Sequence, residues 1–104
     1  MASHVAIEGI VSEHYRFRYD LGTDVLSVHL DDDHGLVTQG ELTPAGDTLL
    51  RDQKSGRPVA LTVKGFWKRE GKGQPADTSP QTRQHIEQFA KDALGLNHKT
   101  PPKP

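Results

Sequence analysis

The side chains best suited to chemistry in this sequence lie in one short acidic segment. The run 31–33 consists of three aspartates and is followed directly by His34. Carboxylate oxygens beside an imidazole are suitable ligands for a divalent cation, so the candidate metal ligands are Asp31, Asp33 and His34. The segment lacks the flanking helices of an EF-hand, and an Asp-rich stretch is also typical of a solvent-exposed turn. The sequence therefore favours a turn, with a metal-dependent enzyme using the Asp31–His34 loop as an alternative.

A second candidate for chemistry is a general acid–base group. His29 follows a turn that contains Asp20 and Asp24, and an imidazole beside a carboxylate is a common proton-transfer pair. No nucleophile or oxyanion donor accompanies it, and the six histidines lack the i, i+4 spacing of a helical zinc site. The chain has no cysteine, which excludes disulfides and thiolate ligands. We expect no cofactor, and enzyme activity is the less favoured hypothesis.

Basic and aromatic residues allow a third hypothesis, nucleic-acid binding. Phe66 or Trp67 would stack on a base beside basic side chains that share the face or edge of a sheet opposite the helix. These basic residues are Arg16, Arg18, Lys64, Lys68 and Arg69. The isoelectric point near 6.6 is far from the strongly basic value typical of such domains. Nucleic acid is therefore an unlikely partner.

The formal net charge of −1 conceals a separation of charge along the chain. If the acidic and basic stretches form neighbouring strands, opposite charges face each other across the sheet. The alternative is a dipolar surface that orients a partner protein. Residues 20–50 contain no Lys or Arg, and their acids are Asp20, Asp24, Asp31, Asp32, Asp33, Glu41 and Asp47. Residues 51–72 are mainly basic, with Arg51, Lys54, Arg57, Lys64, Lys68, Arg69 and Lys72 against Asp52 and Glu70.

Apolar–polar alternation predicts strands at 15–19, 25–30, 36–42, 48–52 and 58–64. Gly65 is expected to be a bulge that redirects Phe66 and Trp67. Ser79 and Pro80 are typical of a helix start and Gly95 of a helix end, and the apolar residues between them follow helical spacing. The predicted fold is α+β: a four- to five-stranded antiparallel sheet, a meander of hairpins, with one C-terminal amphipathic helix packed on one face.

The domain organisation follows from these elements. We expect an N-terminal arm or edge strand at 1–12, an antiparallel β core at 13–69, a linker at 70–79, a helix at 80–96 and a disordered tail at 97–104. No signal peptide or membrane-spanning segment is readable, so a cytoplasmic location is expected.

The first hairpin resembles a known family. Its residues Tyr19-Asp20-x-x-x-Asp24-x-Leu26-x-Val28-x-Leu30 are similar to the signature Y-D-x-x-x-D-x-L-x-I-x-L of a family of small bacterial and archaeal β-domains of unknown function. The resemblance covers roughly residues 15–69. It implies a compact antiparallel sheet, and it implies no activity and no catalytic residue.

The sequence thus favours a non-enzymatic protein-interaction module that uses an uncovered sheet face or an unpaired edge strand. The module would either self-associate as a homodimer or bind a protein partner as an accessory, antitoxin-like domain. The residues expected on the interaction face are Arg16, Arg18, Val25, His29, Lys64, Phe66 and Trp67.

Overall fold

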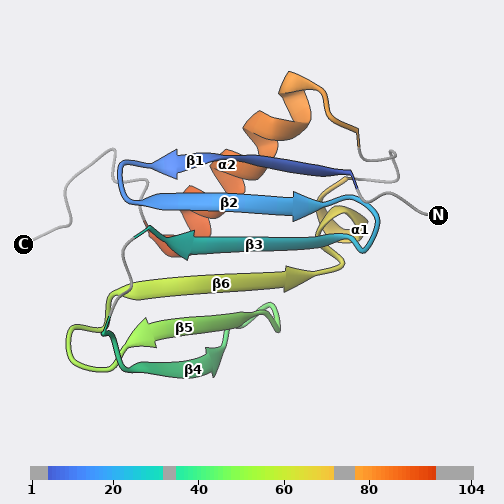
Figure 1. Ribbon diagram of the computed structural model, residues 1–104. Coiled ribbons are helices and arrows are strands. Elements are labelled where there is room, and N and C mark those ends of the chain that lie inside the picture. The colour runs from blue at the N-terminus through green and yellow to red at the C-terminus, as the bar shows by residue number, and fades with distance from the viewer. Residues whose placement is uncertain (1–4, 32–34, 72–76, 96–104) are drawn as a thin grey trace, which may run out of the picture.

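The computed structural model of the protein describes residues 5–31, 35–71 and 77–95. In these residues it contains one antiparallel sheet and two helices (Figure 1). The strands are β1 (Ala6–Ser12), β2 (Tyr15–Asp20), β3 (Val25–Leu30), β4 (Thr38–Leu42), β5 (Thr48–Asp52) and β6 (Pro58–Lys64). The helices are α1 (Phe66–Glu70) and α2 (Pro80–Leu94).

The six strands lie in the order β1-β2-β3-β6-β5-β4, and every neighbouring pair is antiparallel. The predicted α+β class and antiparallel sheet are confirmed. The sheet has six strands, whereas the sequence predicted four to five. Ala6–Ser12 forms a full edge strand against β2. The meander is also interrupted, because β3 pairs with β6, so that β1-β2-β3 and β4-β5-β6 form two separate meanders.

The core lies between the sheet and α2. Leu26 and Val28 of β3 stand opposite Val63 and Leu61 of β6, and all four side chains are buried in one cluster. Each such side chain contributes about 1.5–3 kcal/mol on burial, so this layer supplies much of the stability. The cluster also contains Ile7, Val11, Tyr15, Phe17, Tyr19, Leu30, Leu49, Phe66, Ile86, Ala90 and Leu94.

Helix α2 has the start and stop residues that the sequence indicates, and it ends at Leu94, before the predicted boundary at 96. The Ser79 side chain accepts a hydrogen bond from the Thr82 N–H, Pro80 occupies the first turn, and Gly95 closes the helix with φ 71°. The apolar stripe through Ile86 faces the sheet, and α2 runs across the face formed by β1, β2 and β3 (Figure 1). The expected tail at 97–104 lies outside the described residues.

Residues 65–70 depart from the prediction. Gly65 adopts φ 68° and starts a short helix, α1, so it is not a bulge within a strand. Phe66 is fully buried, with its ring 5.5 Å from that of Tyr19 and 5.0 Å from that of Phe89. The prediction that Phe66 lies on an exposed interaction face is therefore wrong. Trp67 is half-buried and packs against the core from the same helix.

Candidate functional site

The acidic segment provides no metal centre in the part that the structure describes. Asp31 is exposed, and its Oδ1 forms a salt bridge with Nε of Arg16 at 2.8 Å. Asp33 and His34 lie outside the described residues. Within the three described ranges, no group of three or more His, Cys, Asp or Glu side chains is placed to hold a metal ion. No helix in those ranges is long and apolar enough to cross a membrane.

The expected acid–base group does not form. His29 stands opposite Arg16, whereas Asp20 stands opposite Val25, four residues further along the same strand pair. At about 3.3 Å per residue this separates the imidazole from the Asp20 turn by about 13 Å. The Asp24 carboxylate instead binds the Tyr19 hydroxyl and the Trp67 N–H. The described residues therefore bring no proton-transfer pair together at His29.

Asp24 connects the first hairpin to α1. Its Oδ1 accepts hydrogen bonds from the Tyr19 hydroxyl at 2.6 Å and from the Trp67 N–H at 2.7 Å, and its Oδ2 accepts one from the Lys68 N–H at 3.3 Å. Burial, together with the hydrogen bond to Asp24, raises the pKa of Tyr19. Asp20 bonds the N–H groups of its own turn. The tyrosine and both aspartates of the Y-D-x-x-x-D pattern thus have structural roles.

No described element covers the sheet face opposite α2 (Figure 1). Register places its residues in three rows that cross the sheet. These rows are Ile10-Arg16-His29-Ala60-Leu50-Gly40, Glu8-Arg18-Ser27-Thr62-Thr48-Leu42 and Ala6-Asp20-Val25-Lys64. We call this surface the outer face. Five of the seven predicted interaction residues lie on it, and Phe66 and Trp67 do not.

The outer face has small residues at its centre and apolar residues at its ends. Ser27, Thr62 and Ala60 occupy the middle strands. Ile10 is 59% exposed on β1 and Leu42 is 74% exposed on β4. Exposed apolar side chains of this kind can be buried by contact with another protein.

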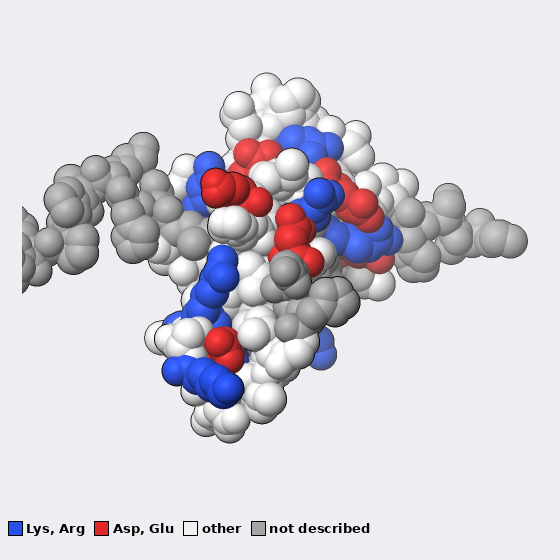
Figure 2. Space-filling view, turned by 60° about the vertical axis from the view of Figure 1, so that its left-hand side comes forward, with Lys and Arg blue, Asp and Glu red and all other residues white. Residues whose placement is uncertain are grey.

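The arginines of the outer face are paired with acids. Arg18 binds Glu8 of the neighbouring strand, and Arg16 binds Asp31. At the far end of the sheet, Arg51 binds Glu41 across β5 and β4, which joins the predicted basic and acidic stretches. Lys and Arg atoms lie beside Asp and Glu atoms over much of the view in Figure 2. The Arg51–Glu41 pair is the kind of contact that the cross-strand hypothesis expected between the two stretches.

The two edges of the sheet differ in how they are protected. On β1, Leu21 N–H bonds Val5 C=O, so alternation directs the backbone groups of Ala6, Glu8 and Ile10 outward. Arg83 of α2 covers this edge by donating to the Glu8 carbonyl at 2.6 Å, and a register shift follows Ile10. A bulge and a cationic side chain are common ways to block an edge strand.

The opposite edge, β4, carries neither device. Gln53 N–H bonds Val37 C=O and Thr43 N–H bonds Asp47 C=O, so Gln39 and Glu41 bond β5. The backbone groups of Thr38, Gly40 and Leu42 then point away from the sheet. Every residue of β4 is exposed, and the strand contains no proline or lysine.

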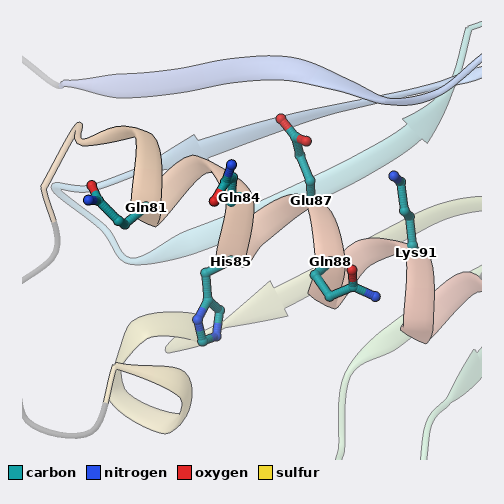
Figure 3. Close-up of a pocket in the computed structure, with 6 residues that line it drawn as sticks. All are labelled: Gln81, Gln84, His85, Glu87, Gln88 and Lys91. Atoms are coloured by element: carbon teal, nitrogen blue, oxygen red, sulfur yellow. The ribbon is translucent and has the colours of Figure 1, made fainter.

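One depression on the helical side is lined by side chains that do not converge on a common centre (Figure 3). It has a volume of about 440 Å³ and lies along the polar surface of α2 (Figure 3). Its side chains come from this one helix and point in different directions instead of toward a common centre. They are Gln81, Gln84, His85, Glu87, Gln88 and Lys91.

Comparison with known proteins adds no functional assignment, because no family model, curated protein or solved structure matches the chain. The candidate site is therefore the outer face with the β4 edge. Sequence alternation predicted part of the face but missed Ile10, Gly40 and Leu42, whose importance depends on which strands lie at the edges.

Proposed function

We propose that this protein is a non-enzymatic interaction module that binds protein through its outer face and its β4 edge. The observation that supports this proposal is a sheet with α2 on one side and no described element on the other. Exposed Ile10 and Leu42 flank a centre of small side chains, and one edge offers free backbone groups. Contact with another protein would bury this apolar surface and satisfy those groups.

The arrangement of charge disfavours nucleic acid as the partner. Binding to phosphates requires basic side chains that release counterions, and Arg16 and Arg18 already bind acids. Of the two aromatic residues expected to stack on a base, Phe66 is fully buried and Trp67 is half-buried against the core. The outer face therefore suits a protein surface better than a polyanion.

In-cell photo-crosslinking tests the proposal. A photoreactive amino acid placed at Thr62 lies at the centre of the outer face, and the same residue at Gln84 lies on the exposed side of α2. We expect Thr62 to yield a discrete crosslinked protein band, either a second copy or another protein, and Gln84 to yield none. Equal crosslinking from the two positions, or none from Thr62 and from a probe at Leu42, would refute the proposal.

A further inference from the structure

The unpaired backbone groups on the open edge of β4 indicate which partner would bind at this end of the outer face. Strand β4 forms the lower edge of the sheet in Figure 1. Its residues Thr38, Gly40 and Leu42 each present an N–H and a C=O that no other described residue binds. We propose that a second copy of this chain pairs with β4 in antiparallel orientation, centred on Gly40, so that one sheet continues through both copies. This inference rests on the proposed function and names the partner at the edge.

Self-pairing centred on Gly40 uses the whole strand. Thr38 of one copy stands opposite Leu42 of the other, and Gly40 stands opposite Gly40. In this register each outward-pointing residue exchanges both of its backbone groups with one residue of the second copy. An arrangement in which the same patch serves on both copies is what a two-fold axis requires. Pairing centred on Leu42 would instead bring Pro44, which has no N–H, opposite Gly40.

The side chains are complementary in the same register. Gln39 of one copy stands opposite Glu41 of the other, so the amide can donate to the carboxylate. Glu41 is also neutralised within its own chain by Arg51, with Nε 3.0 Å from Oε1. The two glycines bring no side chains to the axis, and Leu50 lies beside Gly40, 3.3 Å from where a Cβ would stand. No like charges are placed directly opposite each other.

The protected β1 edge explains why pairing would stop at two copies. Arg83 occupies the Glu8 carbonyl, and the strand ends in a register shift. With one open edge per chain, edge pairing closes at a dimer and does not extend into a fibre. The contact involves only five residues from each copy, so we expect a fast-exchanging dimer with a Kd above about 1 µM.

Sedimentation of the full chain over a concentration series tests the proposal with variants at two positions. Gly40→Pro removes the central outward N–H, which no bond within the chain uses, and it should abolish dimerisation. Gly40→Ala keeps that N–H and should dimerise like the wild type. Gln39→Glu, at an exposed position, places carboxylates opposite each other and should weaken the dimer by roughly 2–20-fold.

Site-resolved amide hydrogen exchange tests the pairing pattern without a variant. On concentrating the wild type, exchange should slow at Thr38, Gly40 and Leu42, while Gln39 and Glu41, already bonded to β5, should be unchanged. A strict monomer at about 1 mM, or a dimer whose protection appears elsewhere, would overturn the inference. A strict monomer that still crosslinks another protein from Thr62 would overturn this inference alone. If the chain is a strict monomer and no protein is crosslinked from Thr62, the proposed function is refuted as well.

Discussion

Replacing Asp24 should be one of the most damaging single changes in the hairpin, because one carboxylate serves three donors. Asp24→Ala removes the cap of α1, which costs about 1 kcal/mol. It leaves the Tyr19 hydroxyl without its acceptor, at a cost of about 1–3 kcal/mol. Asp24 also has φ 57°, and alanine in that conformation costs roughly 1 kcal/mol more.

Together these costs predict a loss of about 3–5 kcal/mol in the free energy of unfolding, or a fall in Tm of about 12 °C or more. Asp24→Asn retains an acceptor and tolerates positive φ, so it should lose only about 1 kcal/mol. Urea unfolding followed by the fluorescence of Trp67, the single tryptophan, measures both variants.

A double-mutant cycle gives the decisive comparison. Tyr19→Phe alone should cost about 1 kcal/mol, and in the Asp24→Ala background it should cost nothing, or even restore stability, because the unsatisfied hydroxyl is gone. Additive effects of the two changes, or a cost below about 1 kcal/mol for Asp24→Ala, would refute the assignment of Asp24 as the link between the hairpin and α1.

Three further changes test other parts of the structure. Gly9→Ala would place a Cβ 2.7 Å from Arg83 Nη1 and from Cε2 of Phe17, so we expect a loss of about 1–3 kcal/mol in urea unfolding; an unchanged midpoint would contradict the close packing. Ile86→Ala should lose about 2–5 kcal/mol in the same assay, while the control Gln84→Ala stays within about 0.5 kcal/mol; equal effects would mean that α2 does not dock as described. Hydrogen bonding from Ser79, then from the Thr82 hydroxyl, lowers the pKa of Asp77 from 3.8 to about 2. Because the pKa of Asp77 is lower in the folded state than in the unfolded state, its stabilisation is complete above about pH 4 and is lost as the pH falls toward 2. Asp77→Asn should therefore flatten the pH dependence of the free energy of unfolding between about pH 4 and 2. An unchanged slope in that window would contradict the hydrogen bonding of Asp77.

Elements with local signals could be predicted from the sequence. The β2–β3 hairpin shows alternation on both sides of a turn, and α2 carries its own cap and stop residues. Helix α1 has no such signal, because its capping carboxylate, Asp24, lies 43 residues before Trp67 in the chain. Without that contact, Phe66 falls on the same side of the β6 alternation as Thr62 and Lys64, so the sequence placed it on the outward face and its burial beside α2 was missed.

The candidate site was likewise predictable from the sequence only in part. Alternation alone places Arg16 and Arg18 on the face opposite Phe17, and register brings His29 beside them. Which strand forms an open edge depends instead on the pairing of β3 with β6, a contact that no local pattern encodes. For the same reason the sequence could not show that Arg83 protects β1 and that β4 lacks such protection.

Binding of partner proteins to the outer face and the β4 edge can be observed residue by residue. The most direct test is an amide correlation spectrum of the isotope-labelled protein at low concentration, in buffer and then in an unlabelled lysate of its source cells. We expect signal loss at outer-face residues such as Ser27 and Thr62 and at Gly40 of β4, with the exposed side of α2 around Gln84 unaffected. Signal loss centred on α2, or no change anywhere, would contradict it.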